Sequence, residues 1–163
     1  MKARVYLGGH IVGLSYDEIM AWQDKIKSRM PHQIECVSPM RDKECLKGMV
    51  ITTEKTSELQ DHLFVTYSGI VARDKFDIRN CDAMIANFDL RPLYPSIGTI
   101  SEVAIAYELK KPVIVIMSDL IHNVNNHPFV MEEAAWVVST PEEATDVVIS
   151  LFGFPALDKG LIS

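Results

Sequence analysis

The run Val113-Ile114-Val115-Ile116-Met117 constrains the fold of this chain more than any other feature. It is uninterrupted and apolar, and it follows a lysine pair and a proline. A strand with apolar side chains on both faces needs cover on both faces, which parallel sheets receive from helices. The run therefore predicts a central strand of a parallel sheet in an α/β protein.

The rest of the chain alternates between short apolar runs and amphipathic segments. This alternation is typical of a flavodoxin-like fold, a doubly wound, five-stranded parallel sheet in three layers that binds ligands beyond the carboxyl ends of its strands. Phe76 and Tyr107 are expected to face the core from two of the helices. We predict strands at 5–7, 33–37, 82–88, 113–117 and 135–138, and helices at 16–30, 69–80, about 98–110 and 141–151.

Three expected helix starts carry the Ser/Thr-x-x-Glu pattern of a capping box, in which two side chains bind free backbone N–H groups. They are Ser15–Glu18, Thr99–Glu102 and Thr140–Glu143, the last with proline at the first helical position. Glu102 therefore has a purely structural interpretation, which competes with any role in chemistry.

Length and composition narrow the class of protein. The 163 residues suit a single domain, 1–163, and the polar stretch 39–63 is too long for a simple connection, which suggests a mobile loop. The net charge of −6 disfavours nucleic acid as a partner. Cys36, Cys45 and Cys81 lack zinc-ligand spacing, and no apolar run is long enough for a membrane span. We expect a protein of the reducing cytoplasm.

Two patterns near the expected ligand edge resemble binding motifs but have the wrong spacing. Gly8-Gly9-x-x-x-Gly13 lacks the GxGxxG spacing, so it is either a phosphate cradle or a tight turn that needs glycine. His122 and His127 favour loop roles over a metal site. A serine-hydrolase function has little support because no Gly-x-Ser-x-Gly elbow is present.

Carboxylates gather around the third predicted strand. Asp74 and Asp77 lie on the helix before it, Asp82 and Asp89 flank it, and Glu102 lies at the start of the following helix. Paired carboxylates around a sugar carbon suit glycosidic chemistry, in which one is the nucleophile and the other handles the proton of the leaving group. The sequence thus predicts a candidate site for cleaving glycosidic bonds.

Four segments carry a family resemblance: Val5–Gly9, Cys81–Asn87, Ser96-x-Gly98-Thr99-x-x-Glu102 and Lys111–Val113. Together they make the chain similar to the nucleoside 2-deoxyribosyltransferase family. The resemblance covers most of the chain and implies a flavodoxin-like fold with Glu102 as the nucleophile that attacks the anomeric carbon. It implies that Asp74, with Asp77 as a competitor, contacts the base and helps to protonate it, and that Tyr6 orients the nucleophile.

Ser96 departs from the transferases of this family, which usually carry an aspartate there. It resembles the related deoxynucleoside 5′-monophosphate N-glycosidases, whose serine binds phosphate, although a serine at a helix start is also an ordinary cap. Asn126, with Asn123 and Asn125 as competitors, matches an asparagine that reaches a neighbouring subunit's sugar, which implies a homo-oligomer with a shared site. The expected substrate-binding residues are Gly8, Gly9, Asp77, Asp89, Ser96, Gly98, Thr99 and Asn126.

The sequence leaves three functions open. The first is transfer of a deoxyribosyl group from a nucleoside to a purine or pyrimidine base, and the second is hydrolysis of nucleoside 5′-monophosphates. The third is a nucleotide-binding module without turnover, because the fold alone does not fix a function. No metal and no organic cofactor is expected, since carboxylates supply both the nucleophile and the acid.

Overall fold

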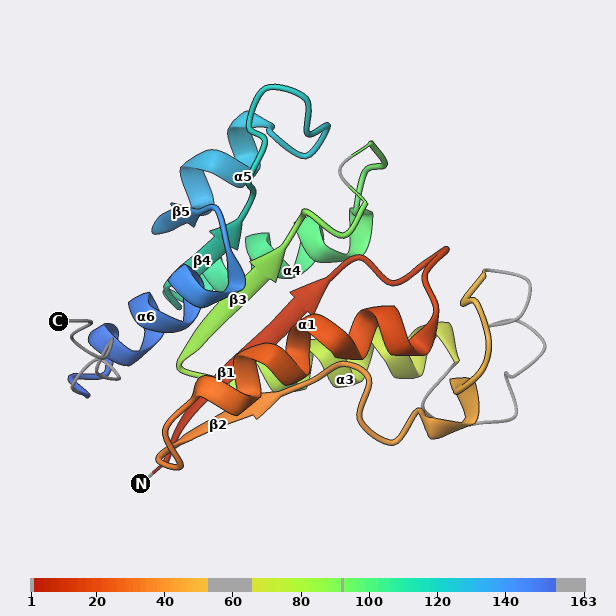
Figure 1. Ribbon diagram of the computed structural model, residues 1–163, viewed down its shortest axis with the longest axis horizontal. Helices are drawn as coiled ribbons and strands as arrows, with labels where there is room; N and C mark the ends of the chain where they lie inside the picture. The colour runs from red at the N-terminus through yellow and green to blue at the C-terminus, as the bar shows by residue number, and fades with distance from the viewer. Residues whose placement is uncertain (1, 53–65, 92, 155–163) are drawn as a thin grey trace, which may run out of the picture.

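The computed structural model describes residues 2–52, 66–91 and 93–154. All neighbouring strands in this part of the chain are parallel, in the order β2-β1-β3-β4-β5 (Figure 1). This is the flavodoxin-like order, in which the winding direction reverses between β1 and β3. The predicted fold class is therefore confirmed. The strands are β1 (Ala3–Gly9), β2 (Ile34–Val37), β3 (Ala83–Asn87), β4 (Val113–Ile116) and β5 (Trp136–Val138).

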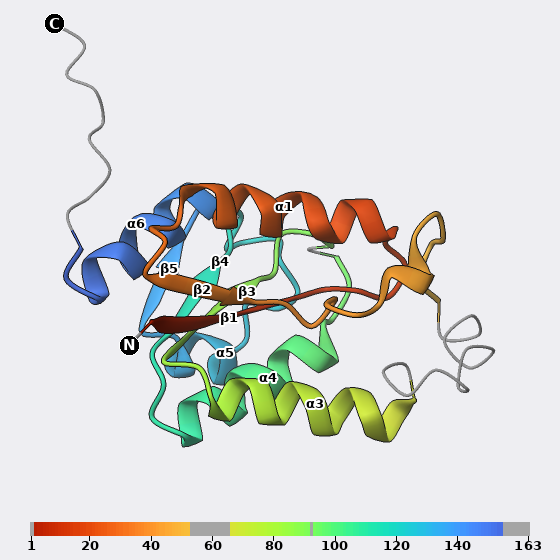
Figure 2. The same cartoon turned by 90° about the horizontal axis from the view of Figure 1, so that it is seen from below.

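Helices cover both faces of the sheet. Figure 2 shows α1 and α6 on one face and α3, α4 and α5 on the other. The sequence pattern does not predict α5, a short helix that begins at Pro128 after the capping residue His127. No helix in the described residues has both the length and the apolar character needed to cross a membrane. The helices are α1 (Tyr16–Arg29), α3 (Tyr67–Arg79), α4 (Ile97–Glu108), α5 (Pro128–Glu133) and α6 (Pro141–Leu151), and Glu44–Leu46 forms the short 3₁₀ helix η1.

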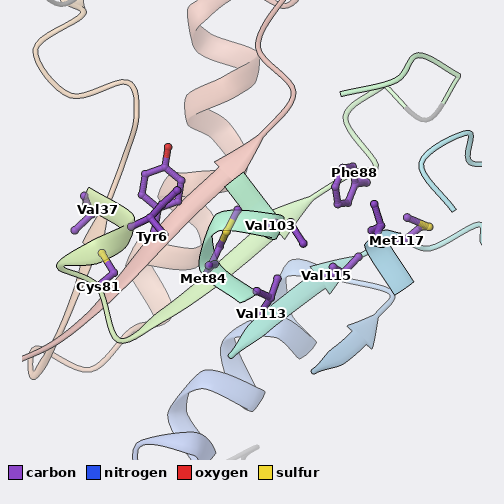
Figure 3. Close-up of a cluster of buried hydrophobic side chains, with 13 residues drawn as sticks. Tyr6, Val37, Cys81, Met84, Phe88, Val103, Val113, Val115 and Met117 are labelled. Atoms are coloured by element: carbon purple, nitrogen blue, oxygen red, sulfur yellow. The ribbon is translucent and has the colours of Figure 1, made fainter. Parts of the chain in front are cut away.

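Two hydrophobic clusters fill the layers on either side of the sheet. Successive side chains of a strand point to opposite faces, so Tyr6 joins the cluster under α3 and α4 while Val5 and Leu7 join the one under α1 and α6. Figure 3 shows Tyr6 in its cluster with Met84 and with side chains of β4 and α4. All four β4 residues are buried, which confirms the expected central strand.

A third hydrophobic cluster holds part of the long segment after β2. Met40, Leu46 and Ile51 are buried against Leu14 and Ile19, at the start of α1. Residues 40–51 are therefore packed on the body of the protein. The remainder of the predicted mobile loop, 53–63, lies outside the described residues.

Two expected core residues are exposed. Phe76 is 61% exposed and Tyr107 is 44% exposed, because each lies on the outer side of its helix. In α3 the buried face carries Asp74, Asp77 and Ile78 instead. Helical periodicity misassigned this face because two of its three buried positions are charged.

The predicted capping box at Thr99–Glu102 is wrong. Helix α4 begins earlier, with Ser96 at the cap position and Thr99 already inside the helix. The other two expected helix starts are confirmed, since Ser15 and Thr140 both accept the backbone N–H three residues later. Glu102 is thus free of a capping role.

Candidate active site

A cavity of about 640 Å³ opens at the carboxyl ends of β1 and β3, a size suited to a small organic ligand. Its walls come from the segment after β1, the turn after β2, the first half of α3 and the start of α4. This is the edge at which doubly wound sheets bind ligands, beside the point where the winding reverses. Asp74 and Glu102 both line it.

Contacts from the sheet fix the Glu102 carboxylate. The hydroxyl of the fully buried Tyr6 donates a hydrogen bond of 2.8 Å to Glu102 Oε1. A Cβ atom on Gly8 would lie 2.8 Å from Glu102 Oε2 and 2.6 Å from Met84 Cε, so glycine leaves room for the carboxylate. The Glu102 carboxylate therefore sits against β1 because Gly8 has no side chain to displace it and the Tyr6 hydroxyl binds it.

The interpretation of Gly8 and Gly9 as a tight turn is wrong. Both belong to β1 and pair with Ala86 and Asn87 of β3. The left-handed backbone lies further on, at Gly13 with a φ of 85°, where a glycine is favoured. Gly9 lines the cavity, whereas Gly8 lies behind the carboxylate of Glu102.

The two carboxyls of the cavity have unusual acidities. Burial raises the pKa of Glu102 to about 8, and the charge of Asp74 adds to the rise. Burial also raises the pKa of Asp74 to about 6, against the opposing charge of Lys43. The coupled pair therefore holds one proton near neutral pH. An anion beside a proton donor is the combination that glycosidic cleavage uses.

Three residues expected to bind substrate have other contacts. Asp77 is almost fully buried and receives two N–H groups of Arg41, one of them at 2.7 Å. Asp89 accepts the backbone N–H of Ser118 at 2.9 Å and so ties the end of β3 to the end of β4. The Asn126 amide donates to the backbone carbonyl of Leu120 at 2.6 Å. None of the three is among the described residues that line the cavity.

Ser96, Gly98 and Thr99 do line the cavity, at the start of α4. Both donors of Ser96 are already used, the backbone N–H by Asn125 Oδ1 at 2.9 Å and the hydroxyl by Thr99 Oγ1 at 2.8 Å. Asn125 is in turn bonded to Asn123, and both are buried. These two asparagines therefore support the loop before α4.

Three further cavity residues are not among the site residues expected from the sequence. Lys43, His10 and Arg91 all line it, from three different loops. The rule that ligands bind at strand ends points to the loops but does not single out these side chains, whose position depends on turns. No group of three potential metal ligands occurs in the part of the chain that the structure describes.

The raised pKa of Glu102 predicts that Glu102→Gln stabilises the protein at alkaline pH. The folded state holds this proton up to about pH 8, whereas the unfolded chain releases it near the ordinary value of 4.5. The wild type therefore loses stability as the pH rises through this window, and the variant does not. We expect a difference of about 2–5 kcal/mol at pH 8.5 that shrinks towards zero at pH 4.5.

The measurement is urea unfolding at both pH values, with Glu108→Gln on the exposed side of α4 as the matched control. Equal stability of Glu102→Gln and wild type at pH 8.5 would contradict the electrostatic description of the site.

Several solved structures resemble the chain, and two of them are the following. One is a conserved protein from Enterococcus faecalis V583, with a TM-score of 0.63 and 15% identity, covering 93% of this chain and 99% of that chain. The other is a molybdenum cofactor binding protein from the phototrophic bacterium Rippkaea orientalis, with a TM-score of 0.53, 18% identity and coverages of 93% and 98%. At these identities the likeness shows the fold alone. No curated protein sequence matches the chain significantly.

The sequence model described as nucleoside 2-deoxyribosyltransferase matches residues 5–157. This range runs from β1 past the end of α6 and includes Tyr6, Asp74 and Glu102. Membership favours a glycosyl-transfer or glycosidase-like enzyme that acts on nucleosides or bases. The expected resemblance is confirmed: the chain belongs to the nucleoside 2-deoxyribosyltransferase family.

Proposed function

We propose that the protein cleaves the N-glycosidic bond of 2′-deoxynucleosides and transfers the deoxyribosyl group to another base. One observation carries the proposal: Glu102, oriented by Tyr6, shares a cavity with Asp74, and the pair holds one proton near neutral pH. A nucleophile and an acid are what a double-displacement mechanism on a sugar requires.

The higher pKa of Glu102 places the shared proton on Glu102 at rest, so the reactive form is the one in which this proton has moved to Asp74. In that form an oxygen of ionised Glu102 attacks C1′ of the sugar, and a C1′–O bond forms. The C1′–N bond breaks, and its electron pair goes to the base. Asp74 supplies the proton that neutralises the departing base. The Tyr6 hydrogen bond occupies Oε1 and holds the plane of the carboxylate, so little orientation is lost on the way to the transition state.

In the second step the covalent glycosyl-Glu102 is released by an incoming base, whose proton returns to Asp74. Water in place of the base would give hydrolysis, so access of water to the cavity decides the reaction class. Apolar side chains such as Met40, Leu46 and Ile51 contribute to the cavity wall and favour a flat base over water. Transfer is therefore the primary proposal.

Glu102→Ala should reduce the release of base from deoxynucleosides by at least about 1000-fold while the protein stays folded. The assay follows free base by chromatography, with and without an acceptor base, and Glu108→Gln serves as the control. Mass spectrometry of the wild type incubated with substrate should detect a deoxyribosyl adduct on Glu102.

Near-normal turnover by a folded Glu102→Ala protein would remove the mechanism. Ligand binding by the wild type without release of any base would instead favour a nucleotide-binding module without turnover.

Hydrolysis of deoxynucleoside 5′-monophosphates is the second candidate, favoured by the start of α4. Its first turn carries no acidic residue, and Gly98 and Thr99 line the cavity at the positive end of the helix dipole. An anion is stable at such a position. Ser96 would add its hydroxyl only by releasing its present bond to Thr99.

Ser96→Asp should weaken the use of nucleoside 5′-monophosphates by about tenfold or more and spare unphosphorylated nucleosides, because it places like charges together. The measurement is kcat/KM for a nucleoside and its 5′-monophosphate in both proteins. Ser101→Asp, on the exposed side of α4, makes the same change away from the cavity. A constant nucleotide-to-nucleoside ratio in Ser96→Asp would show that Ser96 does not face phosphate.

We also propose that the protein is a homo-oligomer with a shared site. Large apolar side chains are exposed near the start of α4 and the segment before α5, including Ile97 at 77% and Ile121 at 87%. Such exposure is typical of surfaces that another chain covers. Asn126 lies outside the cavity of its own chain, which is compatible with a role towards a neighbour.

Sedimentation equilibrium should give a multiple of 18.3 kDa, and a monomer mass at assay concentrations would contradict the proposal of a homo-oligomer.

A further inference from the structure

Lys43 is a buried cation in the wall of the cavity. Its side chain is only 4% exposed, although lysine is among the residues least often buried. The turn after β2 holds it there. The backbone N–H of Lys43 donates a hydrogen bond to the backbone carbonyl of Met40, and the backbone carbonyl of Lys43 accepts the N–H of Leu46. Met40 and Leu46 are both buried in the third cluster. Asp42, with a φ of 57°, completes the turn.

Within the described residues the Lys43 ammonium makes neither a hydrogen bond nor an ion pair, whereas Arg41 holds Asp77 and Arg73 holds Asp42. Lys43 lines the cavity, and its Nζ is not among the buried atoms sealed from solvent. The charge therefore faces the cavity, with its donors available to a ligand.

The surroundings of this charge locate it beside the reacting groups. Lys43 lines the same cavity as Asp74 and Glu102. Burial lowers the pKa of Lys43, the charges of Asp74 and Glu102 raise it, and those of Arg73 and Arg41 lower it. The Asp74–Glu102 pair holds one proton and keeps one negative charge, which would repel a phosphate, whereas the start of α4 offers an anion site away from that charge. Lys43 is therefore suited to a neutral ligand with hydrogen-bond acceptors.

We propose that Lys43 contacts the departing base and selects bases that present carbonyl oxygens. The inference rests on the proposed function and deepens it by naming the substrate class. As the C1′–N bond breaks and its electrons move into the base, negative charge develops on the carbonyl oxygens. The Lys43 ammonium donates a hydrogen bond to one of them and keeps its proton, while Asp74 supplies the proton that the base takes away.

The selectivity follows from the hydrogen-bonding capacity of lysine. An ammonium has three donors and no acceptor, so it can donate a hydrogen bond to an oxo group. It cannot form one with an amino group at the same position, because both groups are donors. A site with a buried polar group discriminates strongly against a ligand that leaves this group unpaired. Oxo bases should therefore be better substrates than the amino bases of the same ring.

The test compares 2′-deoxyinosine with 2′-deoxyadenosine, and 2′-deoxyuridine with 2′-deoxycytidine, because each pair exchanges one oxo group and its neighbouring ring N–H for an amino group and a ring nitrogen, while the rest of the base is unchanged. Lys43→Met keeps the length of the side chain and removes every donor, and Lys43→Gln supplies an acceptor as well as a donor. Lys75→Met removes a lysine from the exposed side of α3 and is the control.

We expect wild type and Lys75→Met to prefer the oxo substrates in kcat/KM. In Lys43→Met this oxo-to-amino ratio should fall at least about tenfold, and in Lys43→Gln it should move further towards the amino substrates.

Equal losses on both members of each pair would overturn the inference, because a lysine that only supports the fold or the charge of Asp74 would slow both alike. If the wild type releases no base from any nucleoside, the proposed function fails and Lys43 is tested by calorimetry with free hypoxanthine and adenine. A wild-type preference for hypoxanthine that disappears in Lys43→Met would uphold the contact, and an unchanged preference would refute it. Lys43→Gln serves both assays if Lys43→Met does not fold.

Discussion

The hydrogen bond from Tyr6 to Glu102 joins the first strand to a helix 96 residues away, and the organisation of the site depends on it. A carboxylate on a helix beside a buried sheet needs a donor, since burial without one is costly. Tyr6 is that donor, and Gly8 supplies the space in which the carboxylate fits. The cavity floor is thus built by two positions of β1 that lie on the same face of the sheet.

Buried charge is distributed in two ways around this hydrogen bond. Asp77 is neutralised by Arg41 in a two-pronged ion pair, which leaves no capacity for a ligand. Asp74 and Glu102 have no such partner, so burial raises the pKa of each and Lys43 only opposes the rise. Two acidic residues one helical turn apart on α3 therefore differ in role because of the cations that reach them. The Asp74–Glu102 pair keeps a proton available for chemistry. The Asp77–Arg41 ion pair holds the turn after β2 against α3.

The sequence predicted the layers of the fold well because these depend on local patterns. The apolar run of β4 and the alternation of strands and helices are properties of neighbouring residues, and so are the helix caps at Ser15 and Thr140. Among the site residues, Asp74 and Glu102 could be named because carboxylates cluster around the third strand in the sequence and the family resemblance implies a role for each of the two. Lys43 and the room at Gly8 could not, since they depend on a turn and on a contact between distant segments. In α3 the pattern failed because charged residues occupy the buried face.

Glu18 and Glu102 illustrate what local pattern leaves undecided. Both stand three residues after a serine or threonine near a helix start, and only Glu18 binds back to the N–H of that residue. At Ser15 the helix starts at the surface, where the glutamate has no better partner than the backbone. Helix α4 starts three residues earlier than the pattern indicates, because Ser96 is held by the buried Asn125. Glu102 lies inside α4 and accepts the hydrogen bond of Tyr6 from β1 instead. The same four-residue pattern therefore gives a cap in one helix and a cavity carboxylate in the other, and tertiary contacts make the difference.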